Sequence, residues 1–535
     1  MDSATDRVPD LAGVAEAVAA RWAGRVAVTV DGSRARAVLE CPAAELVWVC
    51  DWLCASRGYS FATLVAEDAP AEWMLRYIFY GIEGRGQVHV LLRLPATQTA
   101  VPSISPRVIA ADWHERGIED LFGLDFEGHP RLGDFVLHEE WPEGVNPMRK
   151  AFDAAQPYPG RQAEPDWQPL TVVRAAGAFA MPIGPVYSDG AESAHFLLET
   201  VGEDVIRTIP RFFYKFRGVE KLAEGRSVED ALLLAERFSG SSAFAHALAF
   251  CQAVEEIGTL EIPERACALR LLVAELERLR HHVAAISGIC QSTALAVATS
   301  QAAILEEELL RESCVLAGHR YFFGLNVPGG LSLDLPDDAC RRLARSVGRI
   351  HGRLLDLRRM LSMTSSFLDR LEGVGIVARE QALSYGLVGP IARASGVATD
   401  LRCGLPYGAY RGGPALVVPC EEQGDGYARL RVLFAEAEQS ALLVQQTAVA
   451  LPGGPVRASR KGVAAGEALG WAEAPSGAAF HWLRLDERGR VGRYRVTSPA
   501  FVNWHGFHLA AEEFAFQDFP IIMASFGLSN AECDR

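Results

Sequence analysis

Two hydrophobic periodicities run along the chain. Between residues 74 and 95, apolar side chains alternate with polar ones in MLRYIFYG and QVHVLLRLP, and the turn residues GIEGRG lie between these runs. This alternation predicts two antiparallel strands. In the second half, apolar residues recur every three or four positions, which predicts amphipathic helices. The runs with helical spacing are residues 228–238, 264–289, 300–324 and 340–371.

The order of these patterns predicts an α+β protein with two structured parts. Residues 1–152 mix helical and strand patterns and are expected to form a small α+β domain. Residues 153–180 are rich in proline and polar residues and are interpreted as a linker. Residues 181–535 are expected to form a mainly helical domain with short strands, because HWLRLD and GRYRVTS near the carboxyl end alternate like strands.

Size, charge and hydropathy narrow the class of protein. A chain of 535 residues is long enough for two or more cores. Its formal net charge of -15 argues against a general nucleic-acid binder, which needs surplus lysine and arginine. The first residues, MDSATDRVPDLAGVAEA, lack the features of a secretory signal or transit peptide. No window approaches the roughly 20 unbroken apolar residues of a membrane helix, so we expect a soluble chain that can still dock onto a membrane partner.

The cysteines favour a reducing compartment. Eleven cysteines in a chain of this length do not form a disulfide-dense pattern, and an odd number would leave one unpaired. Cys50 and Cys54 lie in an apolar helical run and are interpreted as core residues. No Cys-x-x-Cys occurs, so a zinc ribbon or a cysteine-held iron–sulfur cluster has no local support.

Long blocks of the sequence carry a family resemblance. Residues 111–152, from ADWHERGIEDLFGLDFEGHPRLGDF to NPMRKAF, resemble the C-type subunit of respiratory complex I. The blocks GPVYSDGAESAHFLLETVGE, RGVEKLAEGR, LVGPIARASGVATDLR, GDGYARLRV and SPAFVNW resemble the D-type subunit and the large subunit of membrane-bound nickel–iron hydrogenases. The fused order of the two parts is known in complex I and in hydrogenases of the formate hydrogenlyase type. The block EIPERACALRLLVAELERLRHHVA is more similar to the latter.

The resemblance places four metal-ligand positions in this chain. In the hydrogenases, two Cys-x-x-Cys pairs hold a nickel–iron centre; here Ser239 and Ser242 occupy the first pair, and Ser529 and Glu532 the second. Nickel and low-valent iron prefer thiolates, so we expect no metal in this chain and interpret these four residues as lining a pocket. Cys533 lies one position beyond the last ligand and cannot replace the set. An oxygen-ligated metal would have one carboxylate, which is few for a hard cation; a small polar cavity filled by water is the alternative.

Complex I also suggests quinone chemistry, and here the chain departs from the pattern. Matching GPVYSDGAESAH to the complex I loop puts Tyr187 and Ala191 at its two histidine positions, and Gly240 falls at the position of its tyrosine. A phenol transfers a proton less readily than an imidazole near neutral pH, so a quinone pocket of the usual type is not expected. Tyr187 could still donate a hydrogen bond to a carbonyl group.

A charged segment around these positions is a candidate for proton handling. Glu220 follows Arg217 by three residues, so the two would face one another on a helix. The resemblance makes Glu220 the equivalent of a proton-relay glutamate, and a structural ion pair is the alternative. We therefore name Glu220, Arg217 and Tyr187 as candidate proton-relay or pocket residues. His246 and His282 lie among apolar residues and are interpreted as core histidines.

The resemblance implies partners and leaves three functions open. Expected partners are an iron–sulfur subunit of the complex I B-type, whose cluster serves as the cofactor, and membrane-embedded antiporter-like and anchor subunits. The chain would then be a peripheral subunit on the cytoplasmic face of the inner membrane, taking part in electron transfer or ion coupling without nickel–iron chemistry. The alternatives are a structural scaffold with a decayed redox site, and an enzyme with a quinone or another ligand in the remodelled pocket.

Overall fold

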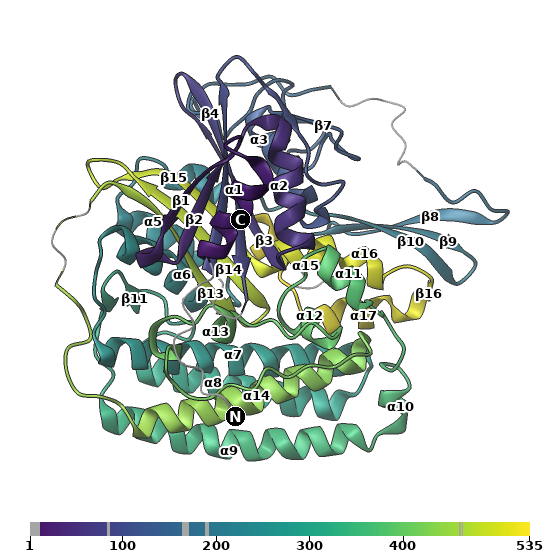
Figure 1. The fold of residues 1–535 in the computed structure, drawn as a ribbon. Helices are drawn as coiled ribbons and strands as arrows, with labels where there is room; N and C mark the ends of the chain where they lie inside the picture. Colours follow the sequence, from purple (N-terminus) through teal and green to yellow (C-terminus); the bar gives the residue numbers. More distant parts are fainter. Residues whose placement is uncertain (1–10, 83–85, 163–170, 188–191, 460–461, 463) are drawn as a thin grey trace.

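The computed structural model describes residues 11–82, 86–162, 171–187, 192–459, 462 and 464–535. Helices and strands are mixed throughout, which confirms the predicted α+β class. The amino-terminal part sits above a layer of long helices, and a small sheet projects to one side (Figure 1). Ala191, which the sequence placed at the second histidine position of the quinone loop, lies outside the described residues.

The amino-terminal part is a five-stranded sheet with three helices. The strand order is β1-β2-β5-β4-β3, with β2 and β5 parallel and the other pairs antiparallel. The pairing of β4 with β5 confirms the two strands predicted from alternation. Cys50 is buried in α2, as expected of a core cysteine. The elements are α1 (Leu11–Trp22), β1 (Ala27–Asp31), β2 (Arg36–Glu40), α2 (Ala43–Ala55), β3 (Tyr59–Asp68), β4 (Glu72–Gly81), β5 (Gly86–Pro95), β6 (Ala100–Pro102), α3 (Asp112–Phe122) and β7 (Asp125–Glu127).

A second, four-stranded sheet begins the carboxyl-terminal part. Its antiparallel strands β8, β9 and β10 extend away from the body, and the short β16 adds to its other edge (Figure 1). The strands are β8 (Ala178–Ile183), β9 (His195–Val201), β10 (Asp204–Arg211) and β16 (Phe514–Ala515). The predicted boundaries at residues 152 and 180 stay predictions, although β8 begins at Ala178.

Four long helices form the layer beneath both sheets. Helices α7, α8, α9 and α14 pack around one another, and each contacts two of the others (Figure 1). Three of them were predicted from helical spacing, but α8 ends at Ala317 because Gly318 adopts a left-handed conformation with φ of 78°. The helices are α4 (Val219–Ala223), α5 (Val228–Arg237), α6 (Ala243–Ile257), α7 (Glu264–Ser292), α8 (Ala296–Ala317), α9 (Asp337–Ser362), α10 (Ser365–Leu368), α11 (Arg379–Ser384), α12 (Gly389–Ala394), α13 (Leu401–Gly404) and α14 (Gly426–Val449).

A three-stranded antiparallel sheet and four short helices complete the chain. Helix α6 crosses β13 so closely that a side chain at Gly470 would lie 1.9 Å from the carbonyl oxygen of Ala249, so only glycine fits there. The elements are β11 (Asn326–Val327), β12 (Gly330–Leu331), β13 (Gly466–Ala474), β14 (Gly477–Leu485), β15 (Val491–Thr497), α15 (Pro499–His505), α16 (Phe507–Ala510), α17 (Phe519–Phe526) and α18 (Asn530–Asp534).

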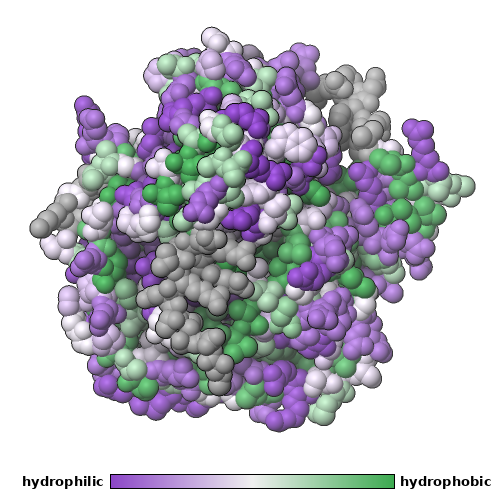
Figure 2. All heavy atoms as spheres, in the orientation of Figure 1, coloured by the Kyte–Doolittle hydropathy of each residue, from purple (hydrophilic) through white to green (hydrophobic). Residues whose placement is uncertain are grey.

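The two parts of the chain share one interface and one core. Arg493 of β15 donates to Asp68 of β3 at 2.6 Å, and Thr497 donates to Thr63 at 2.8 Å. One buried apolar cluster contains residues of both parts, among them Trp113. Hydrophilic and hydrophobic side chains are interspersed over the face shown in Figure 2. Among the described helices, none combines the length and apolar character needed to cross a bilayer.

Candidate functional site

The candidate site lies where the loop before α6 meets α18. Ser239 and Ser242 are fully buried in that loop, and Glu532 projects from α18 with 1% of its surface exposed. The Ser239 hydroxyl donates to Oε2 of Glu532 at 2.7 Å, and the Ser241 hydroxyl donates to the same oxygen at 3.1 Å. The Ser242 hydroxyl lies 3.5 Å from that of Ser241. We call the four positions that the resemblance assigns to metal ligands the former ligand positions. Three of them therefore lie within one buried hydrogen-bonded group.

The loop is held in place by its own hydroxyl and by α7. The Ser239 hydroxyl accepts a hydrogen bond from the backbone N–H of Ser242 at 3.2 Å. The first turn of α6 has no side-chain cap of its own; instead, Glu277 of α7 accepts from the N–H groups of Phe244 and Ala245 at 2.8 and 3.0 Å. Arg280, also on α7, donates to the Ser241 carbonyl at 2.6 Å.

Ser529 has a different set of partners. Its hydroxyl lies 3.0 Å from both carboxylate oxygens of Glu192, which precedes β9. It also accepts from the Glu532 N–H at 3.1 Å, which makes Ser529 the N-cap of α18. Glu192 accepts a further bond from the Ala531 N–H at 2.9 Å. The fourth position thus anchors the carboxyl-terminal helix to the segment before β9.

Two histidines and a tyrosine extend the group inwards. Nε2 of His246 lies 3.6 Å from Oε1 of Glu532, and its Nδ1 lies 2.9 Å from Nε2 of His481. Nδ1 of His481 lies 2.7 Å from the Tyr494 hydroxyl. His246 is a buried core histidine, as predicted, but the structure also places it in the site. The sequence analysis did not identify His481 and Tyr494. Strands β14 and β15 are distant along the chain from the segment with Ser239 and Ser242, and both side chains follow the pattern of a buried strand.

The electrostatics of the site favour an ionised Glu532. Burial opposes its charge, but His246 and the hydroxyls of Ser239 and Ser241 outweigh burial and lower the pKa of Glu532. Burial, together with the neighbouring His246, holds the pKa of His481 well below its usual value. The site is therefore a buried carboxylate that accepts hydrogen bonds, and His481, which contacts His246 at the inner end of the group, is neutral near pH 7.

The predicted pairing of Arg217 with Glu220 is wrong. Gly218 adopts a left-handed conformation with φ of 64°, so Arg217 lies before α4 rather than on it. Its guanidinium donates to the carbonyls of Phe238, at 2.9 Å, and Ala531. Glu220 is buried against Arg495, with both oxygens 3.4 Å from Nη1. Arg217 therefore braces the two segments that carry the site, while Glu220 forms a structural ion pair.

The remaining predicted residues lie at the edge of the site or away from it. The Tyr187 hydroxyl donates to the carbonyl of Ala194 at 2.9 Å, within its own loop. Gly240 is exposed in the loop before α6. Cys533 is fully buried, and burial raises its pKa well above the usual value, so its thiol stays protonated.

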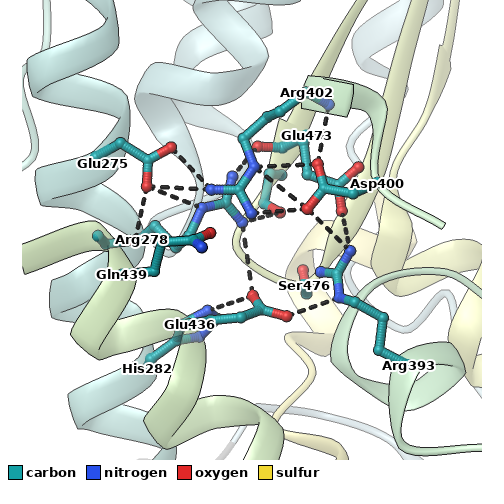
Figure 3. Close-up of polar contacts among 12 residues, drawn as sticks. Glu275, Arg278, His282, Arg393, Asp400, Arg402, Glu436, Gln439, Glu473 and Ser476 are labelled. Atoms are coloured by element: carbon teal, nitrogen blue, oxygen red, sulfur yellow. Dashed lines mark hydrogen bonds and ion pairs between the residues drawn. The ribbon is translucent and has the colours of Figure 1, made fainter. Parts of the chain in front are cut away.

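A larger group of charged residues lies between α7, α14 and β13, and we call it the arginine–carboxylate cluster (Figure 3). Arg402 donates to Glu275 at 2.9 Å and to Asp400 at 2.7 Å. Arg393 lies 2.7 Å from Glu436 and donates to Glu473 at 3.0 Å. The cluster consists of Glu275, Arg278, His282, Arg393, Asp400, Arg402, Glu436 and Glu473, all buried.

The arginine–carboxylate cluster joins the helical layer to the sheet of β13. His282 of α7 lies 2.8 Å from Glu436 of α14, so the predicted core histidine has a charged partner. Burial opposes ionisation of Glu436, but Arg393 and His282 outweigh it and lower its pKa to about 2. Sequence reasoning missed this cluster because its members come from separate elements that are distant along the chain.

The donor atoms at the former ligand positions do not match a nickel–iron centre. Ser239, Ser242 and Ser529 offer hydroxyls and Glu532 a carboxylate, whereas nickel and low-valent iron prefer soft thiolates. The described ranges also contain no group of three or more His, Cys, Asp or Glu residues arranged to hold a metal ion.

Comparisons with known proteins match both parts of this architecture. Residues 39–158 match the family "Respiratory-chain NADH dehydrogenase, 30 Kd subunit", and residues 302–465 and 459–535 match the corresponding "49 Kd subunit". Residues 217–286, which include Ser239 and Ser242, match the "Nickel-dependent hydrogenase" family.

Individual relatives give the same result. Formate hydrogenlyase subunit 5 of Escherichia coli (strain K12) is 32% identical over 84% of this chain and 79% of its own length. The fused C/D-type subunit of NADH-quinone oxidoreductase from Acinetobacter baylyi (strain ATCC 33305 / BD413 / ADP1) is 25% identical over 87% of this chain and 85% of its own. A chain from the membrane-bound sulfane sulfur reductase, an archaeal respiratory membrane complex, superposes with a TM-score of 0.64 at 27% identity, covering 67% of this chain and 99% of that chain. This chain therefore belongs to the family of fused complex I C/D-type and hydrogenase large-subunit proteins that includes formate hydrogenlyase subunit 5.

Proposed function

We propose that this chain is a peripheral subunit of a membrane-bound redox complex, taking part in electron transfer or its coupling to ion translocation without a nickel–iron centre of its own. Its partners in this proposal are an iron–sulfur subunit of the complex I B-type and membrane-embedded antiporter-like and anchor subunits. The cluster that serves this site belongs to the iron–sulfur partner. The complex lies on the cytoplasmic face of the cell membrane.

The relatives support the assembly part of this proposal. One is named a formate hydrogenlyase subunit and another a hydrogenase-4 component, and several are NADH-quinone oxidoreductase subunits. The solved neighbour is part of a respiratory membrane complex. Fusion of the 30 Kd and 49 Kd families in one chain, with shared apolar packing between them, supports a single rigid arm.

One observation supports the proposed absence of a nickel–iron centre: the side chains at the former ligand positions are hydrogen-bonded to other side chains of this chain. Glu532 accepts from Ser239 and Ser241 and faces His246, and Ser529 is engaged with Glu192. A serine hydroxyl remains protonated near neutral pH and is a poor ligand for nickel. The same residues can instead hold charge and orient hydrogen bonds at a buried position beside the partner's cluster.

Metal content tests the absence of nickel. The assembly is purified from native membranes through a tag on this subunit, and nickel and iron are measured per chain by elemental mass spectrometry. We expect iron from a co-purified partner and less than a tenth of a nickel atom per chain. A hydrogenase with its four cysteines, purified in the same way, is the positive control. Stoichiometric nickel would overturn the proposal.

Two conservative variants separate a redox role from a scaffold with a decayed site. Tyr187→Phe and Glu220→Gln change the two candidate relay residues named from the sequence, with little change in volume, and the measured quantities are subunit stoichiometry and electron transfer to a quinone or another acceptor. We expect an intact complex with at least a tenfold loss of electron transfer in one of the two variants. Unchanged electron transfer in both variants would favour the scaffold. The Glu308→Gln variant, on an exposed ion pair with Arg353, is the matched control.

A further inference from the structure

A cavity of about 500 Å³ lies between the two parts of the chain. It is lined by α3 and the loop after β7 from the amino-terminal part, and by β9, β10, α15 and α16 from the carboxyl-terminal part. Its size is typical of a small-molecule site. None of the residues named so far as pocket or relay candidates lines it.

The rim of the cavity carries several arginines, one of which has no carboxylate partner. Four arginines line it, namely Arg116, Arg131, Arg207 and Arg211, against the two carboxylates of Asp134 and Glu512. Three of these arginines lie within ion-pair distance of a carboxylate: Arg131 of Asp112, Arg207 of Glu199 and Arg211 of Glu139, and Asp134 is bound by Arg161. Among the described residues, Arg116 has no such partner. An unpaired guanidinium group at a concave, partly apolar site favours an anion.

Two of these arginines present buried donors that no group of the described protein satisfies. Nη1 of Arg211 donates to Glu139 at 2.5 Å, but its Nη2 atom has no hydrogen-bond partner. Nε of Arg116 and the hydroxyl of Thr208 are likewise buried and unpartnered. Buried polar atoms are normally satisfied, so three orphan donors around one cavity point to an absent acceptor.

The inner wall of the cavity is aromatic. The Trp113 ring lies 5.3 Å from Phe135, 5.9 Å from Phe212 and 6.4 Å from Phe213, measured between ring centroids. The Arg116 guanidinium lies 4.2 Å from the centroid of Phe135. Flat aromatic walls pack best against a flat apolar body.

Two histidines at the same cavity add no positive charge near pH 7. Burial, and then the neighbouring His505 and Arg131, lower the pKa of His508 to about 4. Burial also lowers the pKa of His505 despite its contact with Asp112 at 3.3 Å. Both rings are therefore neutral near pH 7, which leaves the positive charge on the arginines.

We propose that this cavity binds a small aromatic anion, with its carboxylate, phosphate or sulfonate group on Arg116 and Arg211 and its ring against Trp113 and Phe135. The inference is independent of the proposed function, since it rests on a separate cavity. It assigns the junction between the two parts of the chain as a ligand site.

Three probes test the chemistry on the unmodified full-length chain by isothermal titration calorimetry. The anion 2-naphthoate should bind with one site per chain. Its neutral analogue 2-naphthamide should bind at least tenfold more weakly, because it lacks the charge. Octanoate, an anion without a ring, should also bind at least tenfold more weakly. Equal affinity for naphthoate and naphthamide, or no binding of naphthoate at millimolar concentration, would overturn the proposal, and equal affinity for octanoate would overturn its aromatic part.

Variants locate the site. Arg211→Gln and Arg116→Gln should each weaken naphthoate binding at least tenfold, and thermal melting verifies that each variant is folded. Arg342→Gln, an exposed arginine of α9 that pairs with Asp338, is the matched control and should bind as the wild type does. The same titration on the purified complex excludes occupancy by a partner. If naphthoate binds the isolated chain but not the complex, a partner side chain fills the cavity and the proposal is wrong.

Discussion

Glu532 stands at a position that the sequence resemblance assigns to a metal-ligand thiolate, and its surroundings suit a carboxylate. Ser239 and Ser241 donate to it, and His246 faces its other oxygen. A buried charge is stable only when such donors compensate its lost hydration. At the residue scale, the site is therefore a small polar network whose members depend on one another.

Removing one donor should reveal this dependence. We expect Ser239→Ala to lower the free energy of unfolding by about 1–3 kcal/mol at pH 7, because a buried carboxylate loses a hydrogen bond. The folded pKa of Glu532 lies below 4.5, so its stabilising effect is present above that pH and is lost as the pH falls. The difference in the free energy of unfolding between Ser239→Ala and the wild type should therefore be smaller at pH 4 than at pH 7 in urea titrations. Ser384→Ala, at an exposed serine of α11, should change stability by less than about 0.5 kcal/mol.

At the scale of elements, α6 depends on a neighbouring helix for its first turn. Glu277 of α7 accepts from two N–H groups there and has no arginine within ion-pair distance among the contacts of the described chain. Burial outweighs these two hydrogen bonds and raises its pKa to about 7. A carboxyl group whose folded pKa exceeds the unfolded value of 4.5 destabilises the fold progressively as the pH rises between the two values.

The Glu277→Gln variant should therefore become more stable relative to the wild type as the pH increases. Between pH 4.5 and 8 we expect the difference in unfolding free energy to move in favour of glutamine by about 3 kcal/mol. Glu277→Ala leaves both N–H groups without an acceptor and should be destabilised by about 2 kcal/mol at pH 5. Urea titrations across this range measure both effects. A difference between Glu277→Gln and wild type that does not change with pH would contradict this account.

At the scale of the whole molecule, the arginine–carboxylate cluster ties the helical layer to the sheet that supports the site. Four carboxylates and three guanidinium groups converge there without exposure to solvent (Figure 3). Breaking one partner of such a group is costly because the remaining charges stay buried. The cluster is thus a point where acid should weaken the fold.

Glu436 makes this acid sensitivity measurable. Its folded pKa of about 2 is below the usual 4.5, so its stabilisation is complete above pH 4.5 and is lost between pH 4.5 and 2. We expect the wild type to lose about 3 kcal/mol more than Glu436→Gln across this window. Chemical unfolding at pH 5, 4, 3 and 2 provides the comparison. Parallel pH dependence of the two proteins would contradict the assigned role of Glu436.

The sequence by itself determined the α+β class, the paired strands β4 and β5, most of the long helices and the family. These follow from local periodicity and from ordered blocks of residues, both of which are encoded along the chain. It also named Ser239, Ser242, Ser529 and Glu532 as candidate pocket residues, because the family resemblance assigns them to metal-ligand positions.

Tertiary structure alone decided how these residues are used. The left-handed Gly218 places Arg217 before α4 and apart from Glu220, and Ser529 hydrogen-bonds to Glu192. His481 and Tyr494 joined the site from β14 and β15, far along the chain from the serine loop, and the cavity at Arg116 and Arg211 formed where the two parts of the chain meet. Contacts between distant segments depend on packing of whole elements, and neither periodicity nor spacing along the chain records them.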